Sequence, residues 1–303
     1  MIPGRDPEAA SRSGAGSRAD AEVTCMKKGK TVLLAGMGGL LCAGAVSVWL
    51  IAPGRATEEQ RSLIQNRYFA HRGLYDSAGG IPENSLAAFR AAAEHGYGAE
   101  LDVRMTRDGV LVVSHDSDLR RMTGAALAVE ENDYDTLAAL RLEGTDEGVP
   151  LFSDALEILF AADVPVIVEI KADPAGRRDA LCSAVLAELD RRDGRFCVES
   201  FDPMIVRWFR VHAPDILRGQ LTAQIEALGT GPFQSFAGSR VLANFLGRPQ
   251  FIAHRVGRKS RAVRAAEAMG AMRVCWTAHS PGQEDNNDAV IFENFLPPVR
   301  FDG

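Results

Sequence analysis

The chain has 303 residues, of which 46% are hydrophobic and 24% are charged, and its formal net charge is -6. This composition is typical of a globular protein and excludes wholesale disorder or a collagen-like repeat. The net negative charge offers no basic surface for general nucleic-acid binding, and five cysteines without a C-x-x-C pair indicate neither a disulfide framework nor a thiolate zinc site.

An uncharged apolar run, residues 31–52, follows a polar and Gly/Ser-rich N-terminal segment. A helix of this length, at about 1.5 Å per residue, reaches roughly 33 Å and can cross a bilayer. We therefore expect a disordered cytoplasmic tail (1–30), one transmembrane helix (31–52) and a juxtamembrane linker (53–66). Three lysines directly before the run predict a cytoplasmic N-terminus, which places the rest of a single-pass cell-membrane protein outside the cytoplasm.

Two alternatives concern the processing of this segment. Gly54-Arg55-Ala56 is an acceptable cleavage site, so secretion after signal cleavage is the alternative to a retained anchor. A buried core helix is disfavoured because the run has no polar face. Met26 is followed by a lysine-rich stretch and then the apolar run, which is typical of an export signal. We hypothesise that translation starts at Met26.

Hydrophobic periodicity predicts alternating strands and helices after the anchor. The expected strands are 68–73, 97–103, 164–170, 196–201, 217–221, 251–254, 273–277 and 289–292, with an additional hairpin strand at 110–115. The expected helices are 85–94, with Asn84 as its N-cap, and 153–162, 177–192, 203–211 and 259–269. Residues 117–149 are irregular and predict a small cap or long loop, with a short helical run near 137–142.

Eight strands interleaved with helices over about 250 residues match the size and order of a (β/α)8 TIM barrel. We expect this α/β fold over residues 67–303. A doubly wound open sheet is the alternative, but no glycine fingerprint for a dinucleotide follows the first strand. In a TIM barrel the chemistry takes place at the carboxyl ends of the strands, so the residues at those ends are the candidates for function.

Carboxylates end two of the expected strands. Glu100 and Asp102 share one face of their strand, and Glu169 shares a face with Lys171, because side chains alternate along a strand. Three carboxylates that converge in a barrel mouth repel one another unless a cation lies between them. Oxygen-only ligands favour a hard ion, so we expect one divalent cation, Mg²⁺ or Ca²⁺.

Basic and imidazole side chains end the same strands. Arg72 and Lys171 could bind an anionic phosphate, Arg72 through its planar fork and Lys171 as a point charge. His71 and His115 form a plausible acid–base pair, in which one takes a proton from the attacking oxygen and the other protonates the leaving group. Together with a metal that stabilises charge on phosphoryl oxygens, these residues predict phosphodiester cleavage.

Ten short motifs follow one another along the chain. They are Phe69-Ala70-His71-Arg72-Gly73, Pro82-Glu83-Asn84-Ser85, Ala88-Phe89, Glu100-Leu101-Asp102-Val103, Thr106-Arg107-Asp108-Gly109, Val112-Val113-Ser114-His115-Asp116, Thr123-Gly124, Glu169-Ile170-Lys171, Ser200-Phe201-Asp202-Pro203 and Trp276-Thr277. In order and spacing these motifs resemble the glycerophosphodiester phosphodiesterase family, and the resemblance covers roughly residues 67–298. A single dipeptide such as His115-Asp116 carries no weight, but the order and spacing of the whole set are specific.

The resemblance implies a role for each matched residue. His71 and His115 would be the acid–base pair, and Glu100, Asp102 and Glu169 the metal ligands. Phosphate contacts would come from Arg72 and Lys171, and a pocket wall from Phe201 and Trp276. Glu83 and Asn84 would hold these groups in place.

The sequence departs from the family pattern at a few positions. Ser85 replaces Thr, Ala278-His279 replaces Val-Asn, and residues 290–294 (Val-Ile-Phe-Glu-Asn) replace Gly-Ile-Ile-Thr-Asp. The two later departures follow the last strands, where loop residues often shape specificity, so they put the leaving-group side of the pocket in doubt.

Three functions remain open at this stage. The favoured one is metal-dependent hydrolysis of a small or lipid-derived glycerophosphodiester to an alcohol and sn-glycerol 3-phosphate. The second is a lysophospholipase D-like or cyclising phosphodiesterase that acts on membrane lipids. The third is a non-catalytic anchored binding protein, which the complete charged set disfavours.

Overall fold

The structure, a computed structural model, describes residues 44–142, 144–228 and 231–301. The chain divides into two compact units, residues 1–49 and 50–303. In the first unit, residues 44–49 are helical. The expected tail, the start at Met26 and residues 31–43 of the expected anchor lie outside the described residues. Within the described ranges, no helix has the length and apolar character needed to span a membrane.

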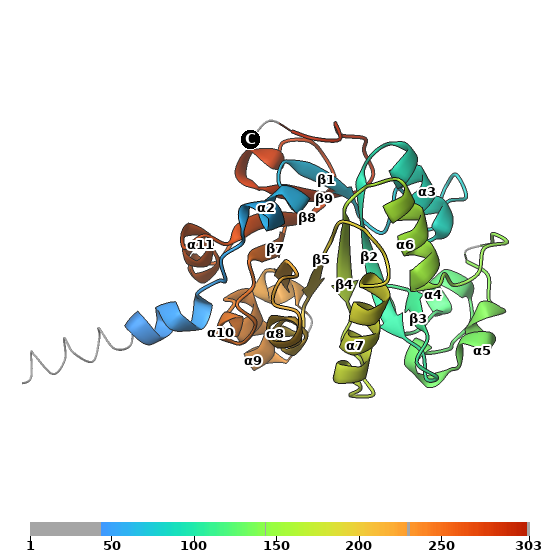
Figure 1. The fold of residues 1–303 in the computed structure, drawn as a ribbon, viewed down its shortest axis with the longest axis horizontal. Coiled ribbons are helices and arrows are strands. Elements are labelled where there is room, and N and C mark those ends of the chain that lie inside the picture. The colour runs from blue at the N-terminus through green and yellow to red at the C-terminus, as the bar shows by residue number, and fades with distance from the viewer. Residues whose placement is uncertain (1–43, 143, 229–230, 302–303) are drawn as a thin grey trace, which may run out of the picture. The chain divides into compact units, whose positions relative to one another are not determined.

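Eight parallel strands of the described chain close into a barrel, as the sequence predicts (Figure 1). They are β1 (Arg67–Ala70), β2 (Gly98–Met105), β4 (Val166–Ile170), β5 (Phe196–Ser200), β6 (Arg218–Thr222), β7 (Phe251–Arg255), β8 (Met272–Ala278) and β9 (Ala289–Phe292). β1 pairs with both β2 and β9, which joins the first strand to the last. The expected hairpin strand is β3 (Leu111–Val113), which pairs antiparallel with β2.

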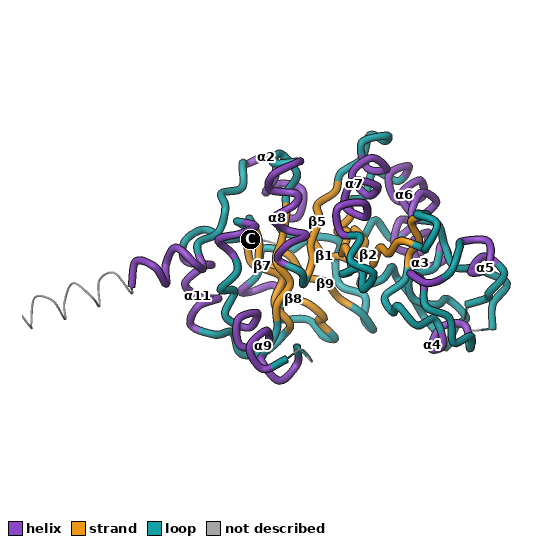
Figure 2. The backbone as a smooth tube through the Cα atoms, turned by 90° about the horizontal axis from the view of Figure 1, so that it is seen from below, coloured by secondary structure: helices purple, strands orange, loops and turns teal. Residues whose placement is uncertain are grey.

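Helices surround the strands, which lie at the centre of the view in Figure 2. The five expected helices are α3 (Leu86–Glu94), α6 (Phe152–Ala161), α7 (Arg178–Leu189), α8 (Pro203–His212) and α11 (Arg261–Ala268). The predicted N-cap of α3 was wrong. Ser85, not Asn84, accepts the hydrogen bond from the Ala88 amide. Asn84 has φ 56° and turns its side chain toward the barrel instead, as described below.

The interior of the barrel is apolar away from the strand ends. Phe69 and Phe251 belong to one buried cluster with residues from most of the other strands. Two glycines make room for these rings. A Cβ on Gly98 would lie 2.6 Å from the ring of Phe69, and one on Gly219 would lie 2.0 Å from the ring of Phe251. Strand alternation places the polar strand-end residues above this packed layer.

Two insertions interrupt the regular alternation. The first is the predicted cap, which contains α4 (Arg120–Thr123), η1 (Val129–Glu131) and α5 (Tyr134–Ala138). It has its own small core, formed by Val112, Leu119, Met122, Val129, Leu137, Leu142 and Val149. The second, between β6 and β7, was not predicted as structured. It contains η2 (Ile225–Ala227), α9 (Pro232–Ser239) and α10 (Asn244–Gly247).

The stretch expected as a linker (53–66) contains α2 (Glu58–Ile64), which begins with a capping box between Thr57 and Gln60. Ile64 is buried in the same cluster as Phe69. The Gln60 side chain also donates to the Asp215 carbonyl at 2.8 Å. Residues 53–66 therefore pack onto the barrel. Near the end of the described chain, η3 (Glu284–Asn286) connects β8 to β9.

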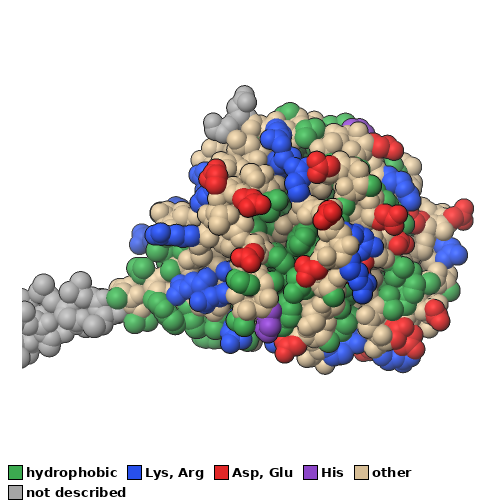
Figure 3. Space-filling view, in the orientation of Figure 1, with side chains coloured by type: hydrophobic (Ala, Val, Ile, Leu, Met, Phe, Trp, Pro, Cys, Tyr) green, Lys and Arg blue, Asp and Glu red, His purple; other side chains and the backbone are tan. Residues whose placement is uncertain are grey.

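Acidic and basic side chains are interspersed over the face drawn in Figure 3. Neither sign of charge forms one continuous field on this face. A separate, buried group of carboxylates, Glu100, Asp102 and Glu169, lies at the carboxyl ends of the strands.

Candidate active site

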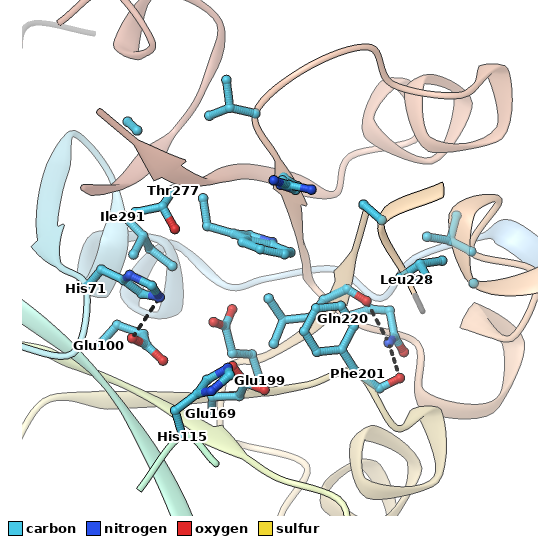
Figure 4. A pocket seen from close by; sticks show the side chains of 18 of the residues that line it. His71, Glu100, His115, Glu169, Glu199, Phe201, Gln220, Leu228, Thr277 and Ile291 are labelled. Carbon is cyan, nitrogen blue, oxygen red and sulfur yellow. Dashed lines mark hydrogen bonds and ion pairs between the residues drawn. The ribbon is translucent and has the colours of Figure 1, made fainter. Parts of the chain in front are cut away.

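A cavity of about 1160 Å³ opens at the carboxyl ends of the barrel strands. Of the predicted site residues, it is lined by His71, Arg72, Glu100, His115, Glu169, Phe201 and Trp276. Asp102 and Lys171 adjoin them, since each forms ion pairs with members of this group. Figure 4 shows the histidines and carboxylates on one side of the cavity and Phe201 on the other. The structure thus brings together every residue that the sequence analysis assigned to the site.

The carboxylates of Glu100, Asp102 and Glu169 form a buried acidic trio, with one oxygen of each within 4.8 Å of the others. Burial, and then repulsion from Asp102 and Glu169, raises the pKa of Glu100 well above its ordinary value. Burial and the Asp102 charge also raise the pKa of Glu169. An ionised trio is therefore unfavourable unless positive charge lies within it. Its oxygen-only donors fit a hard divalent cation.

Lys171 supplies part of that positive charge. Its Nζ lies 2.7 Å from Asp102 Oδ1 and 2.7 Å from Glu169 Oε1. Although burial opposes it, these two carboxylates raise the pKa of Lys171 to about 12. Burial would raise the pKa of Asp102, but Lys171 and Arg72 outweigh it and hold that pKa below the ordinary value. Lys171 therefore bridges the acids in this structure.

Arg72 lies at a tight turn directly after β1. Arg72 has φ 55° and Gly73 has φ 79°, and a Cβ on Gly73 would lie 2.8 Å from the Ala88 backbone. A side chain at position 73 would therefore be strained in both conformation and space. The turn lets the Arg72 amide donate to Glu100 Oε2 at 3.1 Å. The Arg72 guanidinium donates to Glu83 Oε1 at 2.6 Å and lies 3.5 Å from Asp102.

Asn84 holds one of the three acids. Its Nδ2 donates to Asp102 Oδ2 at 2.7 Å, and its backbone amide donates to the Arg72 carbonyl at 2.8 Å. The left-handed backbone of Asn84 makes this orientation possible, because it turns the side chain away from the start of α3. Glu83 and Asn84 thus contact Arg72 and Asp102 directly, in line with the supporting position that the resemblance implies.

His71 is held by a carboxylate from the opposite end of the chain. Its Nδ1 lies 2.7 Å from Glu293 Oε2, which also accepts from the Tyr75 hydroxyl at 2.8 Å. Burial opposes ionisation of Glu293, but the contact with His71 outweighs it and lowers its pKa to about 2. A carboxylate at Nδ1 fixes the proton there. The Nε2 of His71, 3.9 Å from Glu100 Oε2, then faces the acidic trio.

His115 has a comparable partner. Its Nδ1 lies 2.7 Å from Asp116 Oδ1, and Arg121 of the cap donates to Asp116 Oδ2 at 2.6 Å. Arg121 also donates to Glu83 Oε1 at 2.6 Å, which links this group to Arg72. Burial lowers the pKa of His115. The cap therefore contributes a positioning arginine to the site, and both histidines have Nδ1 occupied and Nε2 available to the cavity.

Two carboxylates in the cavity were not found by sequence reasoning. Glu199 of β5 is 2% exposed, and its Oε2 has no hydrogen-bond partner among the described residues. Burial, and then the Glu169 charge, raises its pKa well above the ordinary value, so it favours the protonated form. Glu199 is two positions before Phe201, so both side chains are expected on the same face of the strand, and the sequence could have placed Glu199 in the cavity on that ground. Glu293 was noticed only as a departure from the family pattern.

The two later departures from that pattern contact each other. His279 Nδ1 lies 3.3 Å from Glu293 Oε1, and both residues line the cavity. A change at one of these positions therefore changes the surroundings of the other, and through Glu293 those of His71.

Phe201 and Trp276 form an aromatic edge to the charged region, with ring centroids 5.6 Å apart at 89°. The Trp276 Nε1 donates to the Ala253 carbonyl at 2.9 Å. Because the indole N–H has this partner, its ring can present an apolar surface to the cavity without leaving the donor unsatisfied. Both residues line the cavity as expected.

The chain matches known proteins of one family along most of its length. The model of the glycerophosphoryl diester phosphodiesterase family matches residues 71–293. A glycerophosphodiester phosphodiesterase of Caldanaerobacter subterraneus is 32% identical over 162 residues, which cover 50% of this chain and 65% of that protein. The rat lysophospholipase D GDPD1 is 32% identical over 154 residues, 46% of this chain and 47% of its own. The matches thus span about half to two thirds of these relatives.

Solved structures agree on the fold. A phosphodiesterase of Oleispira antarctica, determined with its product sn-glycerol 3-phosphate, has a TM-score of 0.63 and 21% identity, and covers 77% of this chain and 94% of its own. A glycerophosphodiester phosphodiesterase of Parabacteroides distasonis has a TM-score of 0.59 and 22% identity, and covers 76% of this chain and 93% of its own. Because the family match includes both histidines and the whole acidic trio, the chain belongs to the glycerophosphoryl diester phosphodiesterase family.

Proposed function

We propose that the protein is a metal-dependent hydrolase that converts glycerophosphodiesters to an alcohol and sn-glycerol 3-phosphate. The observation that carries this proposal is the convergence of the acidic trio and both histidines on one cavity. The names of the relatives above and the product bound to the Oleispira antarctica enzyme support the choice of substrate.

Glu100, Asp102 and Glu169 would hold the divalent cation. Mg²⁺ and Ca²⁺ both accept carboxylate oxygens, and either ion would neutralise negative charge on the phosphate when bound. Arg72 and Lys171 would bind phosphate oxygens. They lie within the same charged group as the trio, so their carboxylate contacts keep them close to the position of the phosphate.

His71 and His115 would move the protons of the reaction. Water adds to phosphorus and gives up a proton to one imidazole Nε2, while the bond from phosphorus to the alcohol oxygen breaks and that oxygen takes a proton from the other imidazole. Glu293 and Asp116 would keep each ring in the tautomer and orientation that this exchange needs.

The decisive experiment is release of glycerol phosphate from a panel of glycerophosphodiesters, first with chelator and then with added Mg²⁺ or Ca²⁺. We expect activity to disappear with chelator and return with one of the ions. Phosphorus NMR of the products separates hydrolysis from cyclisation. If no diester of the panel released glycerol phosphate with either ion present, the result would favour the non-catalytic binding protein.

We further propose that residues 31–52 anchor the protein in the cell membrane with the barrel outside the cytoplasm. The uncharged run and the lysines before it support this orientation. Fractionation of native cells, with external protease digestion, tests it. Intact mass of the native protein distinguishes a retained anchor from signal cleavage and identifies the starting residue.

A further inference from the structure

One basic side chain of the cavity has no acidic partner. Arg255 is the last residue of β7, and it lines the cavity at an exposed position of the rim. Its guanidinium forms no ion pair and no hydrogen bond with any residue that the structure describes. The other basic residues of the lining each lie within ion-pair distance of a carboxylate, and they are His71, Arg72, His115 and His279. Arg255 therefore has its donors available to a ligand.

The position of Arg255 in β7 directs its side chain toward the barrel mouth. Side chains alternate along a strand, so Arg255 shares a face with Phe251 and Ala253. Both of these belong to the buried cluster of the barrel interior. The backbone next to Arg255 is also held, because the Val256 amide donates to the Trp276 carbonyl at 2.6 Å. Arg255 is thus the next inward position above the packed layer.

The strand order places Arg255 across the barrel from the acidic trio. The closed ring of strands runs β1-β9-β8-β7-β6-β5-β4-β2, so β7 is four strands from β2 in either direction. Glu100 and Asp102 lie on β2, and Glu169 lies on the adjacent β4. A phosphate bound at the trio would lie against the wall opposite Arg255. Arg255 is therefore placed to contact another part of the same substrate.

Further basic residues follow Arg255 along the chain. Residues 255–264 contain five basic side chains and no acidic one. Of these five, only Lys259 forms an ion pair within the described part of the chain, with Glu267 at 2.7 Å. Glu226, an exposed acid of the neighbouring insertion, forms no ion pair with them in the same part of the chain. Unpaired positive charge on this rim attracts anions to the cavity.

The cavity has room and hydrogen-bonding groups for a second polar part of the substrate. Gln234, Ser280 and Gln283 line it together with Arg255. Its volume of about 1160 Å³ exceeds the roughly 300–1,000 Å³ of pockets that hold drug-sized ligands. A glycerophosphodiester with a small alcohol is smaller than such ligands and would fill only part of this space. A larger alcohol could extend from the trio toward Arg255.

We infer that Arg255 binds a second anionic group of the substrate, and that the preferred diesters carry a phosphate or carboxylate on the leaving alcohol. This inference rests on the proposed function and names the substrate class of the same site. In that function the retained product is sn-glycerol 3-phosphate, which has only neutral hydroxyls besides its phosphate. The second anionic group must therefore belong to the alcohol. A planar guanidinium can bind two oxygens of either group.

The test compares diesters that differ in the charge of the leaving alcohol. We would measure kcat/KM of the full-length protein for glycerophosphoglycerol, glycerophosphoglycerol phosphate and glycerophosphoglycerate, with the free activating ion held constant. We expect about fivefold higher values for the two anionic diesters, the effect of a favourable but solvated ion pair. This preference should shrink between about 0.01 M and about 1 M salt, since the Debye length falls from about 30 Å to about 3 Å.

Two variants and one matched control locate the effect. Arg255→Gln should lower the ratio of anionic to neutral kcat/KM to about one, because the charge is lost. Arg255→Lys should keep part of the preference, since it retains the charge without the planar fork. Arg258→Gln removes the same charge from the same exposed loop, but Arg258 is not among the lining residues, so it should keep the wild-type ratio. Thermal melting of each variant checks folding.

Each outcome decides one point. Equal kcat/KM for neutral and anionic diesters overturns the inference and leaves the proposed function intact. A preference that Arg255→Gln does not reduce also overturns it, because the second group would then bind elsewhere. An equal loss in Arg258→Gln overturns it as well, since the charge of the whole segment would then be responsible. No turnover of any diester with either ion refutes the proposed function, and with it the inference.

Discussion

The two halves of the barrel interior differ in almost every property although the same strands build them. The amino-terminal half is packed with rings such as Phe69 and Phe251, with glycines opposite them. The carboxyl-terminal half holds Glu100, Asp102 and Glu169, whose burial and mutual repulsion raise two of their pKa values. One half stabilises the fold, and the other carries a charge arrangement that opposes it. Substitutions in the carboxyl-terminal half should therefore lower activity more than stability, and substitutions in the amino-terminal half should lower stability more than activity.

Glu100→Gln should produce the largest change. We expect kcat/KM to fall by at least about 10³-fold, since one ligand of the proposed cation is lost. The metal-free melting temperature should not fall, because the substitution removes a carboxyl group whose ionisation is opposed by burial and by the neighbouring acids. Kinetics and thermal melts with and without Mg²⁺ or Ca²⁺ measure both effects. Retention of more than roughly a tenth of wild-type turnover would contradict the ligand role.

His71→Gln and His115→Gln should each lower kcat by about 10²- to 10⁴-fold, the usual contribution of a general acid or base. Ion-dependent thermal stabilisation should persist, because neither imidazole belongs to the acidic trio. If one of these variants lost the stabilisation by the ion as well, its histidine would contribute to ion binding rather than only to proton transfer.

Glu293→Gln tests whether the carboxylate positions His71. We expect kcat to fall by about 10- to 100-fold with little change in KM, as for other groups that orient a catalytic histidine. Glu293→Asp should recover part of the loss. Tyr75→Phe removes the second donor to Glu293 and serves as the matched control, with a smaller effect. A change confined to KM would argue against a positioning role.

Gly219→Ala probes the apolar half. Its new Cβ would lie 2.0 Å from the Phe251 ring, so we expect the free energy of unfolding to fall by about 1–3 kcal/mol. The kcat and KM of the folded enzyme should stay at wild-type values. Gly148→Ala is the control, because its nearest neighbour would be 3.4 Å away and no clash arises. Denaturant unfolding measures both variants.

The smallest expected effect is a pH dependence of stability. Contact with His71 outweighs burial and lowers the pKa of Glu293 from 4.5 to about 2, so folding favours the ionised carboxylate. Its contribution is complete above pH 4.5 and disappears as the pH falls toward 2. The difference in unfolding free energy between wild type and Glu293→Gln should shrink over that interval. A difference that stayed constant would show that the lowered pKa is absent.

Sequence reasoning recovered the features that depend on local patterns. Because side chains alternate along a strand, Glu100 and Asp102 are expected on the same face of theirs. The order of the motifs places both histidines at the same end of the barrel. The features it missed depend on contacts between distant segments. Glu293 and His71 are 222 positions apart, and no local pattern indicates that pair. The residues of α9 resemble a polar loop because Gly, Ser and Pro interrupt their periodicity.

Family membership was predictable for the same reason. The motifs occupy strand ends whose spacing the barrel fixes, so they remain recognisable at low identity. The insertion between β6 and β7 has no such constraint, yet its residues Leu228, Phe233 and Val241 line the cavity. The proposed catalytic groups therefore lie at positions that the barrel fixes, whereas this part of the cavity wall comes from a segment without a regular sequence pattern.

The direct pairing of β1 with β9 has a consequence for the time at which activity appears. A nascent chain that has emerged as far as β8 already contains the acidic trio and both imidazoles, but His71 still lacks Glu293. Without β9, the barrel wall is also open between β8 and β1. Turnover should therefore start only after β9 has docked against β1, and proteolytic removal of β9 and Glu293 should abolish turnover while most of the other strands remain paired.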